Sequence, residues 1–223
     1  MNQMRLIMLI ALVMLPAHVA ATNFELMLHS LTQRFGENSV QSFHDWQAML
    51  TNAEGLSAPE KLTRVNEFFN RRIWFKEDQQ IWGVKDYWAT PMETLGKGEG
   101  DCEDFAIAKY FTLLNLGFTN DQLRFMRATL RFGGEGSSVK QAHMVLAFYS
   151  APGAEPLLLD SLVTEIFPLS RRPDLTPQYS FNNQGYWQLG PGGDGTPNVD
   201  ETRHLNRWQD LLQRAHAEGF DLR

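Results

Sequence analysis

Residues 96–111 read GKGEGDCEDFAIAKYF and hold the only cysteine of the 223-residue chain, Cys102. The stretch opens with three glycines, followed by Asp101, which is a favoured helix N-cap residue. An apolar helical pattern then runs to Leu116, and Gly117 is expected to end the helix. The pattern predicts that the cysteine lies in the first turn of a buried helix. A thiol at that place feels the positive end of the helix dipole and unpaired backbone N–H groups, both of which favour the nucleophilic thiolate.

Acidic side chains flank this thiol on both sides. Asp101, Glu103 and Asp104 would each oppose its ionisation and so partly cancel the effect of the helix dipole. A bound hard divalent cation would resolve the conflict, because calcium takes carboxylate and carbonyl oxygens as ligands. Alternatively, the acids only complement the dipole, with Asp104 capping the helix, and the residues by themselves favour this second interpretation.

The apolar spacing predicts mainly helix before this segment and mainly strand after it. We expect helices at residues 24–35, 40–50 and 59–69, and then an aromatic-rich connection over residues 70–95. The three tryptophans of that connection are expected to pack under loops: Trp74, Trp82 and Trp88. Strands are predicted at residues 123–132, 143–149 and 157–162, before a loop-rich tail that ends in a helix at residues 203–217.

A nucleophilic thiol needs a base and a group that orients the base. His143 opens the apolar strand HMVLAFY, and a two-residue turn at residues 152–153 would place Asp160 opposite Val145, diagonal to His143 and on the same face. Asp160 is also an acid in an apolar strand, where an unpaired buried charge would be costly. Taken singly, His143 could be a packed histidine and Asp160 an exposed strand end. Together with Cys102 they match the nucleophile, base and orienter of a thiol triad.

The N-terminal segment predicts export. Arg5 precedes an apolar run at residues 6–15 and a small-residue stretch at residues 19–21, which together predict a secretory signal peptide over residues 1–21. The apolar run is shorter than the roughly 20 residues of a membrane-spanning helix. The remaining chain, residues 22–223, is long enough to bury one core and is expected to form a single domain.

Composition limits the function further. The formal net charge of −6 argues against nucleic-acid binding, because no stripe of Lys or Arg is present to contact phosphates. A single cysteine excludes an internal disulfide.

Three segments together resemble the bacterial transglutaminase-like cysteine proteinases of the LapG type. They are DYWATPMETLGKGEGDCEDFAIAKYFTLLNLGF at residues 86–118, HMVLAF at residues 143–148 and LLLDSL at residues 157–162. The resemblance runs in order through most of the chain after residue 21. One departure is Ser161, where many members are expected to carry Asn after the triad Asp.

The resemblance implies a papain- and transglutaminase-like α+β fold, in which a helical N-terminal part precedes a catalytic helix packed on an antiparallel sheet. It implies that Cys102 is the nucleophile, that His143 is the general base and acid, and that Asp160 holds the imidazole. It also implies calcium beside the cysteine, held by Asp101 and Glu103, with Asp104 as a further ligand or as the helix cap.

The same resemblance implies a periplasmic endopeptidase. Its substrate would be the N-terminal region of a very large secreted adhesin, cut near a pair of alanines, which releases the adhesin and disperses biofilm. Its inhibitory partner would be an inner-membrane cyclic di-GMP receptor of the LapD type, which sequesters the protease.

Two other functions remain open from the residues. One is a transglutaminase-type acyl transferase that uses the same triad, and the other is a non-catalytic, calcium-stabilised binding module. For the catalytic alternatives, the oxyanion donors are expected to be the backbone amide of Cys102 and a side chain of the segment DYWATP.

Overall fold

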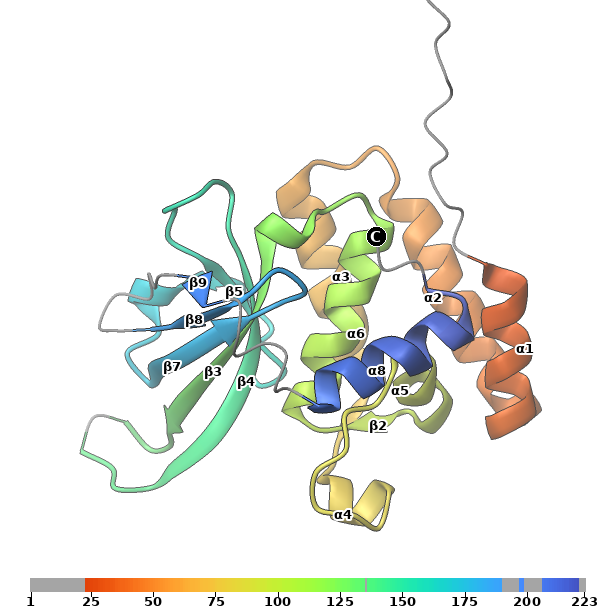
Figure 1. The fold of residues 1–223 in the computed structure, drawn as a ribbon, viewed down its shortest axis with the longest axis horizontal. Helices are drawn as coiled ribbons and strands as arrows, with labels where there is room; N and C mark the ends of the chain where they lie inside the picture. The colour runs from red at the N-terminus through yellow and green to blue at the C-terminus, as the bar shows by residue number, and fades with distance from the viewer. Residues whose placement is uncertain (1–22, 135, 190–196, 199–205, 221–223) are drawn as a thin grey trace, which may run out of the picture.

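The structure, a computed structural model, describes residues 23–134, 136–189, 197–198 and 206–220. Helices gather on one side of a mixed fold and an antiparallel sheet forms the other side (Figure 1), which confirms the expected α+β class. The predicted signal peptide at residues 1–21 lies outside the described residues. No helix of the described part is long and apolar enough to cross a bilayer.

The N-terminal third is helical, as the apolar spacing predicted. A capping box formed by Ser57 and Glu60 starts the third helix, just after a turn. The helices are α1 (Phe24–Phe35), α2 (Val40–Ala53), which follows the short 3-10 turn Glu37–Ser39, and α3 (Ala58–Arg72).

The segment after α3 is more regular than the sequence predicted. It contains the two-residue strand β1 (Trp74–Phe75), the single-turn helix α4 (Asp78–Ile81) and helix α5 (Pro91–Lys97). Helix α5 was missed, although Thr90 and Glu93 form a capping box around a proline at its first position.

The expected packing of the three tryptophans is only partly correct. Trp88 is buried and stacks on Phe181, and Trp82 is half-buried. Trp74 is 79% exposed, so the prediction was wrong for this residue. It follows the C-terminus of α3 directly, where two-residue pairing with β2 leaves its side chain in solvent.

Glycine-rich residues connect α5 to the central helix in a fixed conformation. Gly98 ends α5 with a positive φ of 67°, and β2 (Glu99–Gly100) then pairs in parallel with β1. At Gly100 a Cβ would lie 2.9 Å from the Asp104 Cβ, so only glycine fits there. Helix α6 (Cys102–Asn115) begins two residues later, with Asp101 as N-cap, as predicted.

Within the described residues, the sheet has seven strands in the order β6-β5-β4-β3-β7-β8-β9, all antiparallel. The three predicted strands are present, but β4 begins three residues early and β5 ends at Leu159, just before Asp160. Strands β6 to β9 were not predicted. The bounds are β3 (Leu123–Arg131), β4 (Lys140–Phe148), β5 (Leu157–Leu159), β6 (Phe167–Pro168), β7 (Leu175–Phe181), β8 (Tyr186–Gln188) and β9 (Pro197–Asn198).

The register of β4 and β5 is the predicted one, because Leu146 pairs with Leu159 and Phe148 with Leu157. Buried side chains of α6 and of one face of the sheet share one hydrophobic core, and the other face has a second, smaller core. The last helix, α8 (Asn206–Glu218), packs its Trp208 against aromatic rings of that first core. The predicted start of this helix at residue 203 lies outside the described residues.

Candidate active site

The thiol of Cys102 lies at the first residue of α6 and is 8% exposed. It donates a hydrogen bond to Glu103 Oε2 at 2.7 Å. Burial and then the negative charges of Glu103 and Asp101 raise its pKa well above the usual value, while a hydrogen bond from the backbone N–H of Met144 acts in the opposite direction. The cysteine is therefore a protonated thiol in this arrangement, close to strand β4.

His143 and Asp160 meet, as the strand register predicted. The distance between His143 Nε2 and Asp160 Oδ1 is 2.7 Å, and both side chains are buried. The histidine precedes Met144 in β4, and the backbone N–H of Met144 lies beside the sulfur of Cys102. The structure thus confirms the contact between His143 and Asp160, while the triad with Cys102 stays a prediction.

Additional donors hold the carboxylate of Asp160. Arg172 Nη1 donates to Oδ2 at 2.8 Å, and the backbone N–H of Leu162 donates to Oδ1 at 3.0 Å. Burial alone would raise the pKa of Asp160, but His143, Leu162 and Arg172 outweigh burial and hold it below its usual range. The carboxylate therefore stays ionised beside the imidazole. The sequence analysis did not identify Arg172 as a site residue.

The backbone carbonyl of Asp160 is also fixed. Asn70 Nδ2 donates to it at 2.8 Å, and the fully buried Lys109 Nζ donates at 3.0 Å. Burial lowers the pKa of Lys109 to about 7, and the negative charge of Asp160 partly offsets this effect. Side chains of α3 and α6 thus hold the end of β5 from the helical side.

Three buried carboxylates gather beside the start of α6. One oxygen from each of Asp78, Asp101 and Asp104 lies within 4.8 Å of the others. Burial, and then the negative charges of Asp104, Glu103 and Asp78, raise the pKa of Asp101 to about 10. Asp78 Oδ1 is buried and has no hydrogen-bond partner. An oxygen-rich group of buried acids with an unpaired oxygen fits a hard divalent cation.

The members of this group differ from the acids that the sequence pointed to. Asp104 also caps α6, since its Oδ2 accepts from the Asp101 N–H, and its Oδ1 accepts from the Ala89 N–H at 2.7 Å. Glu103 lies outside the group and pairs with Arg127 at 2.6 Å. Asp78 was not considered because it lies 23 residues before Asp101, and only the α4 turn brings it near.

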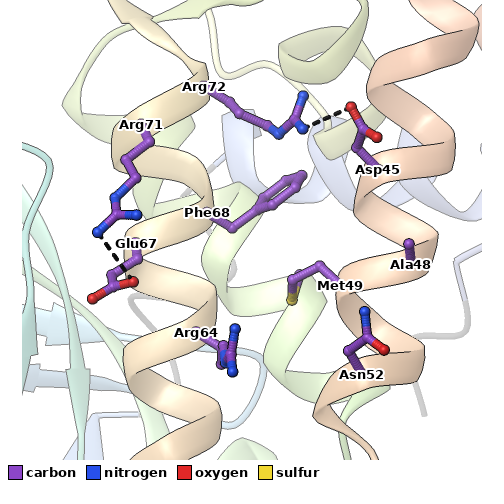
Figure 2. Close-up of a pocket in the computed structure, with 9 residues that line it drawn as sticks. All are labelled: Asp45, Ala48, Met49, Asn52, Arg64, Glu67, Phe68, Arg71 and Arg72. Atoms are coloured by element: carbon purple, nitrogen blue, oxygen red, sulfur yellow. Dashed lines mark ion pairs between the residues drawn. The ribbon is translucent and has the colours of Figure 1, made fainter.

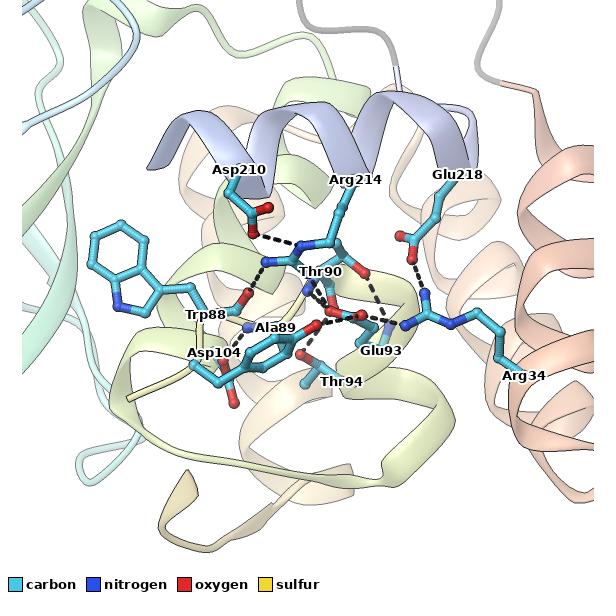
Figure 3. Close-up of polar contacts among 11 residues, drawn as sticks. Arg34, Trp88, Ala89, Thr90, Glu93, Thr94, Asp104, Asp210, Arg214 and Glu218 are labelled. Atoms are coloured by element: carbon cyan, nitrogen blue, oxygen red, sulfur yellow. Dashed lines mark hydrogen bonds and ion pairs between the residues drawn. The ribbon is translucent and has the colours of Figure 1, made fainter. Parts of the chain in front are cut away.

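A polar network supports the segment that carries Ala89 (Figure 3). Glu93, fully buried in α5, accepts hydrogen bonds from the Tyr87 hydroxyl at 2.8 Å and from the Thr90 N–H at 2.8 Å, and it forms ion pairs with Arg34 and Arg214. Helices α1, α5 and α8 are thereby connected behind the acidic group.

The oxyanion donor expected from the segment DYWATP stays a prediction, and the structure shows the partners of three polar side chains of that segment. Asp86 pairs with Arg207, the Tyr87 hydroxyl bonds to Glu93, and the Thr90 hydroxyl caps α5. These three polar side chains are therefore already engaged elsewhere.

A separate pocket of about 480 Å³ opens between α2 and α3 (Figure 2). Arg72 crosses it to pair with Asp45, and Phe68 and Met49 form its apolar floor. No residue of the candidate active site described above lines this pocket, so the pocket is distinct from that site.

Comparisons with known proteins give one consistent relationship. A family model described as bacterial transglutaminase-like cysteine proteinase matches residues 37–188. Three structures of Legionella pneumophila LapG resemble the chain. The EGTA-treated form has a TM-score of 0.72 at 36% identity, covering 86% of this chain and 97% of that one. A second LapG structure has a TM-score of 0.71 at 37% identity, with the same coverage. The calcium-bound form has a TM-score of 0.70 at 38% identity, covering 86% of this chain and 98% of that one.

A search of curated proteins finds no match to this chain. The matching family model spans well over half of the sequence, and the LapG structures are more than one-third identical to it over nearly their whole length. The chain therefore belongs to the family of bacterial transglutaminase-like cysteine proteinases.

Proposed function

We propose that the protein is a calcium-dependent periplasmic endopeptidase that cuts the N-terminal region of a large cell-surface adhesin. Membership of a cysteine proteinase family implies a protein substrate. The observation that carries the proposal is the buried pair of His143 and Asp160, whose side chains lie 2.7 Å apart. The residue that follows His143 in β4, Met144, has its backbone N–H beside the sulfur of Cys102.

The proposed reaction starts with proton transfer from the Cys102 thiol. Because Asp160 holds Nε2 of His143, its Nδ1 is left to take the proton. The sulfur then attacks the scissile carbonyl carbon, and the backbone amide of Cys102 donates to the developing oxyanion. His143 returns the proton to the leaving amine, which leaves an acyl-enzyme. A water molecule, deprotonated by His143, hydrolyses this thioester and frees the thiol.

Asp160 has the orienting role in this scheme. It keeps the neutral imidazole in the tautomer with Nε2–H and stabilises the imidazolium that forms during each proton transfer. Arg172 and the Leu162 N–H fix the carboxylate in turn. These two donors hold Asp160 in a chain that carries Ser161 where many members are expected to carry Asn.

Asp78, Asp101 and Asp104 would hold the calcium ion. When bound, the ion supplies positive charge that lets the three buried carboxylates ionise together next to α6. A calcium-bound structure of the relative from Legionella supports this assignment. Glu103 was expected among the ligands, and its pairing with Arg127 favours a role beside the thiol instead.

Location and partners follow from the resemblance and from the predicted signal peptide. We place the protein in the periplasm, with adhesin release and biofilm dispersal as the outcome of cleavage. We place its control in an inner-membrane cyclic di-GMP receptor of the LapD type.

The test incubates the purified protein and calcium with the N-terminal region of an adhesin exported by the same bacterium, followed by mass spectrometry. Two shorter products are expected from the wild type. Cys102→Ala should abolish cleavage, His143→Ala should be nearly as damaging, and the double variant should lose little more, since triad members act as a unit. Glu67→Gln, on the exposed side of α3, is the control.

Other outcomes would replace the proposal. A gain in mass through cross-linking would identify an acyl transferase. An intact substrate together with a Cys102 thiol that does not react with iodoacetamide would indicate a non-catalytic binding module.

A further inference from the structure

Hydrogen bonds at the two ends of strand β4 show which of its residues direct their backbone N–H and C=O groups toward β3. The Phe132 N–H donates to the Val139 carbonyl at 3.0 Å, and the Tyr149 N–H donates to the Gln122 carbonyl at 2.8 Å. In an antiparallel ladder, residues that bond to one neighbour alternate with residues whose N–H and C=O point the other way. The odd-numbered residues of β4 therefore bond to β3. Lys140, Ala142 and Met144 direct their backbone groups to the opposite edge.

That opposite edge is only half occupied. Strand β5 pairs with β4 over Leu146–Phe148 and ends there. Within the described residues, no strand lies on this side of Lys140–Met144, the part of β4 that precedes the pairing with β5. The residues from Lys140 to Ala142 are exposed. No hydrogen bond from the described residues reaches the backbone N–H or C=O of Ala142 on this side.

The open edge leads to the nucleophile. The Met144 N–H, which belongs to this edge, lies beside the sulfur of Cys102, near enough to favour the thiolate. Ala142 is two residues away along the strand, or about 7 Å at the usual rise of an antiparallel strand. A chain lying along the edge at Ala142 would therefore reach the sulfur within a residue or two.

We propose that an extended segment of the protein substrate adds to this edge of β4 as a new strand, pairing with Ala142 through main-chain hydrogen bonds. The inference rests on the proposed endopeptidase function. An exposed strand edge presents unpaired N–H and C=O groups that any extended chain can satisfy. Its continuity with Cys102 selects the occupant, because only a chain that passes the sulfur can be cut.

Pairing of this kind recognises main chain more than side chains. The cleavage site must be extended when it binds, so a substrate that is helical or folded there should resist. Main-chain pairing also means that a substrate without an N–H at the residue paired with Ala142 should bind more weakly.

The enzyme-side test is Ala142→Pro. Proline removes the N–H that points to the open edge and takes no bond from the β3 ladder, so the sheet can keep its pairing. We expect kcat/KM for adhesin cleavage to fall about tenfold or more, in line with a lost hydrogen bond and a distorted edge. The rate of Cys102 alkylation by iodoacetamide should stay unchanged, because that small reagent needs no strand. Ala142→Ser retains the N–H and serves as the control.

The substrate-side test does not depend on how the variant folds. Ten-residue peptides that span the wild-type cleavage site each carry one N-methylated residue. Strand pairing predicts that blocked positions alternate with tolerated ones, because only every second residue faces β4. The same peptides, labelled with fluorescein, are also measured for binding to the Cys102→Ala protein with and without Ala142→Pro. Because Cys102→Ala is expected not to cleave them, their affinities measure strand pairing separately from catalysis.

Two results would overturn the inference. They are unchanged cleavage and binding by a folded Ala142→Pro protein, and N-methyl tolerance at every position. Failure of the proposed function is distinguishable, because the wild type would then leave the adhesin intact. In that case, labelled peptides tiled across the adhesin N-terminal region replace the peptides designed around the cleavage site. Weaker peptide binding when Ala142→Pro is added to Cys102→Ala would still support strand pairing, and equal binding would contradict it.

Discussion

Arg172 connects the candidate triad to a carboxylate outside it. Its Nη1 donates to Asp160, and its Nε and Nη2 donate to Asp174, so both ends of the guanidinium are held. The residue is 5% exposed. A buried guanidinium that is hydrogen-bonded to two carboxylates holds each of them in one orientation. The imidazole of His143 needs such a fixed carboxylate to be oriented itself.

Arg172→Ala should therefore lower the activity without touching the nucleophile. We expect kcat to fall about ten- to a hundredfold, as for other residues that orient a functional side chain through a hydrogen bond, with KM little changed. Added guanidinium ions should restore part of kcat by filling the space left by the side chain. Steady-state kinetics measure both effects, and Arg72→Ala, at the exposed pair with Asp45, is the control. Wild-type kcat in a folded Arg172→Ala protein would contradict the role.

Asp160 should also leave a signature in the stability of the protein toward acid. Its pKa is lowered in the folded state, so its contribution to stability is present above the unfolded-state pKa of about 4 and is lost as pH falls below it. Asp160→Asn should be less stable than the wild type at pH 6, by on the order of 2 kcal/mol. The difference should shrink between pH 4 and pH 2.

Melting curves across that pH range give the measurement. The exposed Asp121→Asn should show no such pH-dependent difference. A deficit for Asp160→Asn that stays constant down to pH 2 would mean that the charge of Asp160 is not stabilised by its neighbours.

Among the elements, helix α5 depends on a single buried carboxylate. Glu93 caps the helix and pairs with Arg34 from α1 and Arg214 from α8 (Figure 3). Glu93→Gln keeps the shape but removes the charge, so Arg34 and Arg214 lose their shared buried partner and keep only the ion pairs with Glu218 and Asp210 respectively. We expect a loss of roughly 3 kcal/mol in the free energy of unfolding, measured by urea denaturation.

The matched control for Glu93 is Asp210→Asn. Asp210 pairs with the same Arg214, but its side chain is 62% exposed. Because exposed pairs contribute about 0–1 kcal/mol, its replacement should cost little. Equal losses for the two variants would show that α5 is not held by the buried pair.

The elements that the sequence predicted are those whose signals are local. The β4–β5 register was predicted because a tight turn sets it, and α6 because Asp101 and Gly117 mark its ends. Strand β7 was missed because its partner β3 lies more than 40 residues earlier, and such distant pairing leaves no periodic signal. Helix α5 had a capping signal, but its seven residues are too short to show a clear helical period.

For the whole molecule, the three-acid group should couple calcium to stability. Calcium at a hundred times its dissociation constant should stabilise the wild type by about 2.7 kcal/mol, read as a higher Tm that EGTA reverses. Asp78→Asn should lose this response. Without calcium the same variant should melt higher than the wild type, because one of three buried acids whose ionisation is opposed by burial and by its neighbours is gone.

Two variants sharpen the assignment of the calcium ligands. Glu103→Gln, outside the three-acid group, should keep the calcium-dependent rise in Tm, as should the surface variant Glu67→Gln. A calcium response in Asp78→Asn equal to that of the wild type would remove Asp78 from the ligand set. Loss of the response in Glu103→Gln would return Glu103 to it.

The candidate site could be predicted from the sequence only where its residues follow from local patterns. Cys102 was marked by its helix start, and His143 and Asp160 by one hairpin. Asp78 and Arg172 belong to short, irregular segments whose positions depend on the tertiary fold. No spacing in the sequence connects these segments to α6, and the charges that they add became visible only in the structure.

The carbonyl of Asp160 has a consequence for how the protein acquires activity. Its donors, Asn70 and Lys109, lie 90 and 51 residues earlier in the chain, so both helices must dock before the orienting residue is set. Contacts between distant parts of a chain form late, because the intervening chain must first give up its freedom. On the proposed mechanism, a newly made or partly unfolded chain would therefore carry the thiol without an oriented imidazole, and activity would appear only after both helices have docked.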